Sequence, residues 1–247
     1  MGLFIVFRDG CGNRVTSVAG GAAGVLQGGM EQSVIATGSI LGVILAGGIG
    51  RRMGGVEKAK TVLAGKPLAT RVAERLTPQL APGRLVLNAN GPEGHYAALG
   101  LPVVRDDIDG RTGPLAGLLA AMRAAPALAP GVDWVLSAPT DTPFLPRDLV
   151  ARLAAEADAT GAGIVLAASA GGLCQVCGLW PVRLASDIVG ALARGHNKVL
   201  DFVDGQRWSK VMFPLEAASG GTIDPFFNIN TPQDLERASQ FLGGEPV

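Results

Sequence analysis

The chain has 247 residues, with 21 lysines and arginines against 21 aspartates and glutamates, so its formal net charge is zero. Hydrophobic residues make up 48% of the chain and charged residues 17%, which is too apolar and too weakly charged for a disordered protein. Apolar runs are interrupted well before the ~20 residues that span a bilayer, and the neutral balance argues against a general nucleic-acid binder.

The first forty residues are rich in glycine and have no sustained hydrophobic period. We therefore expect residues 1–40 to be a disordered N-terminal extension, with Met30 as an alternative start, and residues 41–247 to form a single domain. The apolar stretch after Met1 is too short for a signal peptide and lacks a basic region before it. The glycines here are not followed by the Lys-Ser/Thr pair of a Walker-type phosphate loop.

Strands and helices are predicted to alternate from residue 41 onward. Continuous apolar runs predict buried strands at residues 41–46, 84–88, 101–105 and 134–138, and a strand pair at 163–168 and 173–180. Helical spacing of apolar residues predicts helices at 67–76, 114–122, 145–157, 181–194 and 231–242. This alternation predicts an α/β fold with a mainly parallel, Rossmann-like sheet flanked by helices, in which ligands bind at the carboxyl ends of the strands.

A glycine-rich loop follows the first predicted strand. Between Leu45 and Lys58 there are five glycines, which let backbone N–H groups approach a polyanion closely. Arg51, Arg52 and Lys58 add positive charge to the same loop. The spacing matches neither the Walker motif nor the dinucleotide fingerprint. The combination predicts a triphosphate site, the alternative being a solvated turn with surface arginines.

Polar residues also end the other predicted parallel strands. Asp141 follows the fourth strand, where a lone carboxylate suits Mg²⁺, which keeps several waters and bridges substrate phosphates. The alternative is that Asp141 caps a turn or helix before Pro143. Asn88 and Asp106 end the second and third strands, where they either bind polar groups of a ribose or base or form turns.

Three cysteines, Cys11, Cys174 and Cys177, are too few for a disulfide framework, and we expect a reducing cytoplasm. Cys174 and Cys177 have the spacing of a redox or zinc motif. Two thiols cannot complete a tetrahedral zinc site, and the two histidines are distant in sequence. Strand alternation predicts that the two side chains lie on opposite faces, with Cys177 filling core volume.

These motifs together resemble the molybdenum cofactor guanylyltransferases of the molybdopterin nucleotidyltransferase family. The resemblance covers about residues 41–242 and rests on the following segments in the family's order: Leu45 to Lys58, Gly65 to Leu68, Asn88 to Asn90, Asp106, Gly113 to Gly117, Pro139 to Pro143 and Asn228 to Pro232. The first segment is shared with the wider nucleotidyltransferase superfamily, and the later ones narrow the resemblance to the molybdopterin branch. It implies that residues 41–247 are a domain of the nucleotidyltransferase type.

The resemblance also implies roles for individual residues. Leu45, Ala46 and Gly47 are expected to contact GTP through their backbone groups. Lys58, helped by Arg52, is expected to bind the nucleotide phosphates during catalysis. Asn88 and Asp106 are expected to contact the nucleoside, and Asp141 is expected to bind Mg²⁺. Asn228 and Asn230 are expected to lie on the molybdopterin side of the site. Cys174-Gln175 stands where family members often have His-Pro, so recognition of the pterin is expected to differ in detail.

The implied reaction is attack by the terminal phosphate of molybdopterin on the α-phosphorus of GTP, which releases pyrophosphate and forms the guanine dinucleotide cofactor. The attacking group is already an anionic oxygen, so the protein needs to supply positioning and positive charge rather than a nucleophile. Expected partners are GTP, molybdopterin, other cofactor-biosynthesis proteins and molybdoenzyme-specific chaperones, with neither nucleic acid nor membrane. The alternatives are a cytidylyltransferase acting on molybdopterin, a sugar-phosphate nucleotidyltransferase and a non-catalytic nucleotide-binding regulator.

Overall fold

A computed structural model of the chain describes residues 6–8, 14–16, 35–47, 49–50, 56–92, 94–107, 113–219 and 221–243. The chain divides into two compact units, Met1–Gln32 and Ser33–Val247. In the first unit, strands β1 (Val6–Arg8) and β2 (Arg14–Thr16) pair antiparallel. Disorder of the first forty residues stays a prediction.

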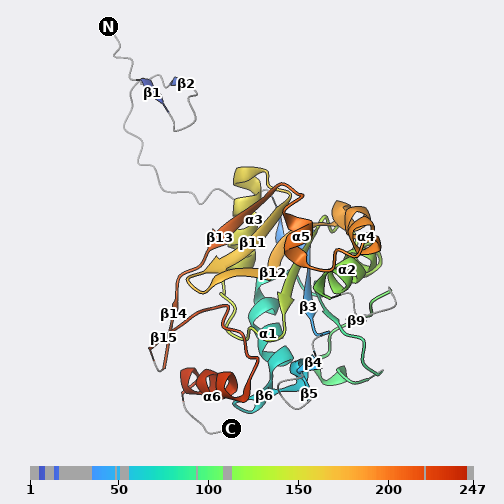
Figure 1. Ribbon diagram of the computed structural model, residues 1–247, viewed down its shortest axis with the longest axis vertical. Coiled ribbons are helices and arrows are strands. Elements are labelled where there is room, and N and C mark those ends of the chain that lie inside the picture. Colours follow the sequence, from blue (N-terminus) through green and yellow to red (C-terminus); the bar gives the residue numbers. More distant parts are fainter. Residues whose placement is uncertain are drawn as a thin grey trace. The chain divides into compact units, whose positions relative to one another are not determined.

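The second unit is built on a seven-stranded sheet (Figure 1). Its order is β13 (Trp208–Met212), β11 (Ile164–Ser169), β12 (Gly172–Pro181), β10 (Trp134–Pro139), β3 (Ile40–Leu45), β8 (Leu85–Asn88) and β9 (Val103–Val104). Every neighbouring pair is parallel except the two pairs made by β12, which runs antiparallel to β10 and β11. The predicted mainly parallel α/β sheet is therefore confirmed.

Helices cover both faces of this sheet (Figure 1). One face packs against α1 (Leu68–Leu76) and α3 (Leu149–Thr160), and the other against α2 (Pro114–Leu128), α4 (Ala185–Ala193) and α5 (Val199–Val203). The neighbouring residues Val43 and Ile44 of β3 are both fully buried, in different cores, because successive strand side chains point to opposite faces. A strand buried on both faces reads as a continuous apolar run.

Smaller elements gather around the carboxyl end of the sheet. They are the hairpins β4 (Ile49–Gly50) with β5 (Val56–Glu57), β6 (Val62–Leu63) with β7 (Lys66–Pro67), and β14 (Glu216–Ala218) with β15 (Gly221–Ile223), together with α6 (Pro232–Phe241). A third core of buried apolar residues joins β6, β15 and α6, and contains Leu63, Leu68, Phe144, Ile223, Ile229 and Ala238. Short 3₁₀ turns complete the unit, at Thr37–Ser39, Lys58–Lys60, Thr77–Gln79, Ala97–Leu99 and Val182–Leu184. In the described parts of the chain, no helix has the length and apolarity to cross a membrane.

The predicted elements occur in the predicted order, with differences at their ends. Helix α2 continues to Leu128, past the predicted end at residue 122, because its apolar face extends to the buried Ala125. Helix α3 begins only at Leu149, since Pro146 lies in the turn before it. The predicted strand at 101–105 is reduced to Val103–Val104, and the predicted helix at 181–194 begins with a 3₁₀ turn.

The prediction that Cys174 and Cys177 lie on opposite faces is wrong. In β11, Leu166 pairs with Gly178 but the next residue, Ala167, pairs with Cys174, so the register shifts and the alternation in β12 is broken. Both cysteines therefore pack into the same core, and both are free thiols. A hydrogen bond between the two thiols, together with burial, raises the pKa of Cys177. Cys177 is fully buried, which confirms that it fills core volume.

Candidate active site

The predicted site residues gather where the chain reverses direction across the sheet. The chain adds β8 and β9 on one side of β3 and then returns to place β10 on the other side. Ligands bind at this kind of switch point in open α/β sheets. The carboxyl ends are held together by backbone bonds from Ala46 N–H to Asn88 O (2.8 Å) and from Thr140 N–H to Leu45 O (3.3 Å).

Three polar side chains meet beside this edge. Lys58 begins the 3₁₀ turn after β5, Asp141 follows β10, and Asn230 precedes α6. Lys58 Nζ lies 2.8 Å from Asp141 Oδ2 and also donates a hydrogen bond to the side-chain oxygen of Asn230. The Lys58 and Asp141 side chains are 17% and 18% exposed, so the pair is shielded but open to a ligand. The structure thus brings together three residues predicted from separate segments.

The N-terminus of α6 holds Asn230 in this position. The Asp234 carboxylate accepts hydrogen bonds from the N–H groups of Asn230 (3.0 Å) and Thr231 (2.9 Å), and the Thr231 hydroxyl accepts one from Asp234 N–H (3.1 Å). These bonds form a capping box. Burial alone would raise the pKa of Asp234, but these hydrogen bonds and the charge of Arg237 outweigh it and lower the pKa. Asp234 therefore stays ionised at neutral pH.

A second polar cluster lies at the ends of β8 and β9. Asn88, which is buried, donates to Asp106 Oδ1 (2.8 Å) and to Val104 O (3.2 Å). Asn90 donates to Asp106 Oδ2 (2.7 Å) and accepts from Asp106 N–H (2.9 Å). The structure brings together Asn88 and Asp106, two of the predicted site residues, and adds Asn90. Its place in the Asn88-to-Asn90 motif was the available sequence signal.

Helix α2 approaches the second cluster at a glycine. A Cβ atom at Gly117 would lie 2.8 Å from Asn88 Cγ, closer than real Cβ atoms come to another atom, and 3.0 Å from Leu45 Cδ2, which is also unusually tight. Glycine at this helical position therefore makes room for the Asn88 side chain. By contrast, a Cβ at Gly47 would meet no described atom within 4 Å.

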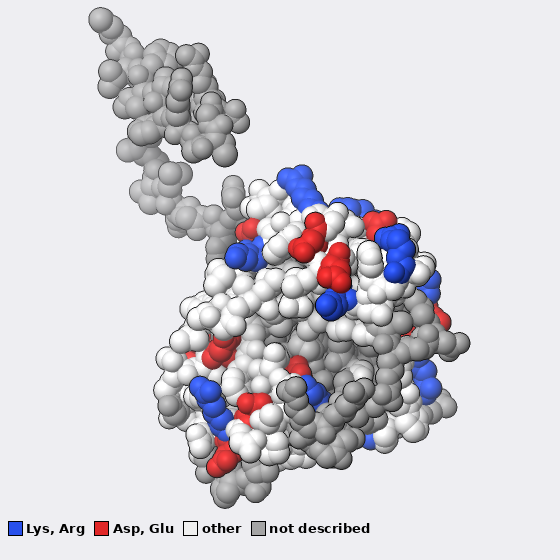
Figure 2. Space-filling model, viewed as in Figure 1, with Lys and Arg blue, Asp and Glu red and all other residues white. Residues whose placement is uncertain are grey.

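The remaining predicted residues lie around these clusters. Leu45 is half-buried and Ala46 buried at the end of β3. Asn228 is exposed, two residues before Asn230. Arg51 and Arg52 lie outside the described residues, as do Gly48 and residues 53–55 of the glycine-rich loop. On the face shown in Figure 2, described basic and acidic side chains are interspersed.

The donor set fits magnesium held together with a substrate. Asp141 supplies a carboxylate and Asn230 an amide oxygen, both of them hard ligands. Within the described residues, no group of three or more His, Cys, Asp or Glu side chains could hold a metal ion. Mg²⁺ does not require such a group, because it is bound through one or two carboxylates plus substrate phosphates and retains water.

The sequence of the chain matches the model of the MobA-like NTP transferase domain over residues 42–210. The chain belongs to this family. It is similar to the molybdenum cofactor guanylyltransferase of Bradyrhizobium sp. (strain ORS 278), with 44% identity over 210 residues, which are 85% of this chain and 96% of the relative. The enzyme of the same name from Cereibacter sphaeroides is 45% identical over 204 residues, 82% of this chain and 97% of the relative. These relatives confirm the resemblance predicted from the motifs.

Solved structures with a similar fold also support the assignment to the MobA-like family. The molybdopterin-guanine dinucleotide biosynthesis protein A from Archaeoglobus fulgidus superimposes with a TM-score of 0.61 at 25% identity, covering 81% of this chain and 97% of that one. A CMP:2-keto-3-deoxy-manno-octonic acid synthetase complexed with CTP also reaches a TM-score of 0.61, at 12% identity over 82% of this chain and 97% of that chain. The second similarity shows the shared fold alone.

Proposed function

We propose that the chain transfers GMP from GTP to the terminal phosphate of molybdopterin. In this reaction a bond forms between the molybdopterin phosphate oxygen and the α-phosphorus of GTP. The bond from the α-phosphorus to the oxygen that bridges to the β-phosphate breaks, and pyrophosphate leaves with the electron pair. The meeting of Lys58, Asp141 and Asn230 at the carboxyl edge of the sheet carries this proposal, and the guanylyltransferase relatives support it.

The Lys58–Asp141 pair is the centre of the proposed chemistry. Lys58 would donate to the nucleotide phosphates, with Arg52 assisting, and the Asp141 carboxylate would hold Mg²⁺. Bound Mg²⁺ supplies positive charge to the phosphate oxygens. In the structure the ammonium group and the carboxylate neutralise each other, so neither charge is left uncompensated at this largely buried site.

The second cluster is proposed to hold the nucleoside. Asn88 and Asp106 contact its polar groups, while backbone groups of Leu45, Ala46 and Gly47 line the site. Asn90 orients Asp106 through the two hydrogen bonds that join them. Fixing these donors and acceptors before the substrate arrives reduces the ordering cost of binding.

The molybdopterin side is proposed to lie near the start of α6. Asn230 and the exposed Asn228 lie there, and Asp234 holds the backbone of Asn230 in place. Because the attacking phosphate is already an anion, aligning it and offsetting repulsion between the two substrates are the tasks left to these side chains.

Pyrophosphate release with GTP, CTP and UTP, each in the presence of molybdopterin and Mg²⁺, tests the proposal. We expect release with GTP that depends on molybdopterin and stops when the metal is chelated. Release with CTP in preference to GTP would instead indicate a cytidylyltransferase. Binding of GTP without release of pyrophosphate would indicate a nucleotide-binding regulator. Other cofactor-biosynthesis proteins and molybdoenzyme chaperones as partners, and a cytoplasmic location, stay predictions.

A further inference from the structure

An arginine-rich pocket lies behind the segment that carries Asp141. It has a volume of about 180 Å³, and its lining residues are Arg71, Glu74, Arg75, Pro143, Phe144, Arg147 and Leu242. This set is distinct from the residues of the candidate active site. The volume is below the roughly 300–1,000 Å³ of typical small-molecule sites, so the pocket suits a small ligand.

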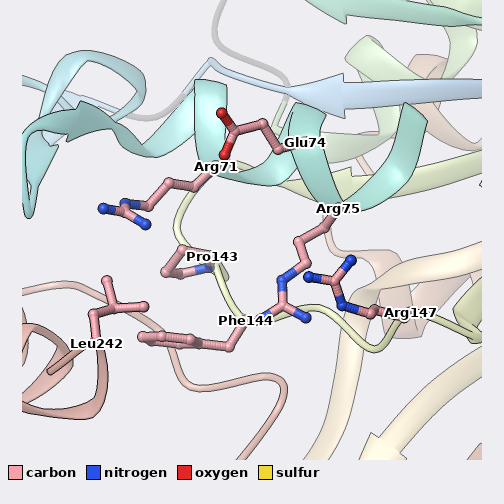
Figure 3. Close-up of a pocket in the computed structure, with 7 residues that line it drawn as sticks. All are labelled: Arg71, Glu74, Arg75, Pro143, Phe144, Arg147 and Leu242. Atoms are coloured by element: carbon pink, nitrogen blue, oxygen red, sulfur yellow. The ribbon is translucent and has the colours of Figure 1, made fainter. Parts of the chain in front are cut away.

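Two of its arginines face each other (Figure 3). The guanidinium group of Arg75, from α1, lies next to that of Arg147, from the turn before α3. Burial lowers the pKa of Arg75, the charge of Glu216 partly offsets this effect, and repulsion from Arg147 lowers the pKa further. Two neighbouring guanidinium charges repel each other unless an anion lies between them.

The carboxylates nearby compensate only part of this charge. Glu216 Oε2 is 4.0 Å from Arg75 Nη1, a long ion pair, and burial raises the pKa of Glu216. Glu74 points away from the arginine pair and is bound to Lys66 at 2.6 Å. Arg147 is exposed and makes neither a hydrogen bond nor an ion pair with any residue that the structure describes. Within the described part of the chain, Arg147 therefore has no close partner of its own, and its charge acts on Glu216, the carboxylate that it shares with Arg75.

Arg71, the third arginine of the pocket, is held in place by hydrogen bonds to the backbone. Arg71 donates from Nε to Leu63 O and from Nη2 to Ala64 O, both at 2.8 Å, and so ties α1 to the turn between β6 and β7. Its position keeps a further positive charge at the pocket. The pairs Lys66–Glu74 and Arg152–Asp148 add no net charge, and Glu216 offsets one of the three pocket arginines, so two positive charges remain among these described groups.

We propose that this pocket binds the phosphate group of a small molecule, held between the guanidinium groups of Arg75 and Arg147. The charge excess matches a dianion, and the planar fork of a guanidinium group pairs with two phosphate oxygens at once. The ligand is either free phosphate or a small phosphate ester whose apolar part packs on Phe144 and Leu242. The site is separate from the proposed reaction, and its test does not require turnover.

Site-resolved NMR tests the proposal in the full chain. The arginine Nε–H signals are followed while inorganic phosphate is added, and glycerol 3-phosphate serves as the ester probe. We expect saturable shifts at Arg75 and Arg147 with either probe, and tighter binding of glycerol 3-phosphate would identify an ester as the ligand. Because the signals belong to named residues, phosphate bound at Lys58 is observed separately.

Substitutions at Arg147 give the matched comparison. Arg147→Glu is expected to weaken phosphate binding at this site at least tenfold, whereas Arg147→Lys, which keeps the charge and loses the fork, should weaken it less. Arg194→Glu, the same change at an exposed position on the opposite face of the sheet, should leave the affinity unchanged. Shifts that chloride reproduces at equal ionic strength, or equal weakening in both Glu variants, would overturn the proposal. If Arg147→Glu melts below the control, Arg147→Gln replaces it in the same comparison.

Discussion

Lys58 and Asp141 are 83 positions apart in the sequence, yet Lys58 Nζ lies 2.8 Å from Asp141 Oδ2. Lys58 directly follows β5 of the small hairpin, and Asp141 follows β10 of the main sheet, so the pair links this hairpin to the carboxyl end of β10. Asn230 adds a third polar contact from the start of α6. In the proposed function, a substrate phosphate would displace Asp141 from Lys58, and the carboxylate would then be available to a metal ion.

We expect Asp141→Ala to lower the rate of pyrophosphate release by roughly a hundredfold or more, because it removes the proposed metal carboxylate. The melting temperature should change little, since the Asp141 side chain lies outside the apolar cores. Asp187→Ala, at an exposed position in α4, serves as the control. Near-normal release at saturating Mg²⁺ would contradict the metal role of Asp141.

Lys58→Ala should weaken GTP binding at least about tenfold, because a charged hydrogen bond to phosphate contributes roughly 1.5–3 kcal/mol. Calorimetric titration with GTP measures the effect. Lys210→Ala removes the same charge from an exposed position on the edge strand β13 and should leave the affinity unchanged. An unchanged dissociation constant for GTP in Lys58→Ala would show that this residue does not bind the nucleotide phosphates.

The sheet and its carboxyl edge could be predicted because burial on both faces leaves a clear sequence signal. The runs at β3, β8 and β10 are continuous and apolar, and Lys58 and Asp141 follow strand ends or their loops. The alternation of strands and helices then fixed which edge these residues share. Asn230 follows no strand of the main sheet, so its position came from the family resemblance alone.

Other features gave no usable signal. Helix α5 has five residues, too few for a hydrophobic period, and β13 is an edge strand of half-buried and exposed residues. Strict alternation failed in β12, because the register shift opposite Leu166 and Ala167 depends on its pairing with β11. The Asn88-to-Asn90 motif contains Asn90 and so indicates it, but the motif does not reveal the bonds to Asp106, which depend on the approach of β8 and β9 in the fold.

Deletion of residues 1–29 should leave stability and turnover largely unchanged. The second compact unit begins at Ser33, and its first core strand begins at the fully buried Ile40. Melting curves and pyrophosphate release of the shortened and full-length chains measure the effect. A fall in melting temperature of more than about 4 °C, roughly 1 kcal/mol or more for a protein of this size, would show that the segment contributes to the fold.

Cys177→Ala should cost about 1 kcal/mol of stability, the scale for deleting one buried methyl-sized group, without changing turnover. The half-buried Cys174 should behave differently: Cys174→Ser is expected to change molybdopterin affinity at most modestly and to leave GTP binding unchanged. Denaturant unfolding and separate titrations with the two substrates check these outcomes. Stoichiometric zinc in the purified protein, lost when either cysteine is replaced, would overturn the interpretation of both residues.

Gly117→Ala tests whether the close approach of α2 positions Asn88. In an exposed helix this change stabilises by about 1 kcal/mol. Here the new methyl group would meet the Asn88 amide and Leu45, and we expect a loss of roughly 1–3 kcal/mol from overpacking. The GTP affinity should fall as well, because Asn88 would have to leave its hydrogen bonds to Asp106 and Val104.

The matched control for this substitution is Gly190→Ala in α4, where the new Cβ would meet only the flexible end of Arg194, at 3.3 Å. This side chain can move, so the helix propensity of alanine should prevail and stabilise the protein by roughly 0.5–1 kcal/mol. Opposite signs for Gly117→Ala and Gly190→Ala in urea unfolding, with GTP affinity lowered only by Gly117→Ala, would support a role for Gly117 in placing Asn88. If both substitutions stabilised the protein and left GTP binding unchanged, α2 would have no such role, and Asn88 would depend on β9 alone.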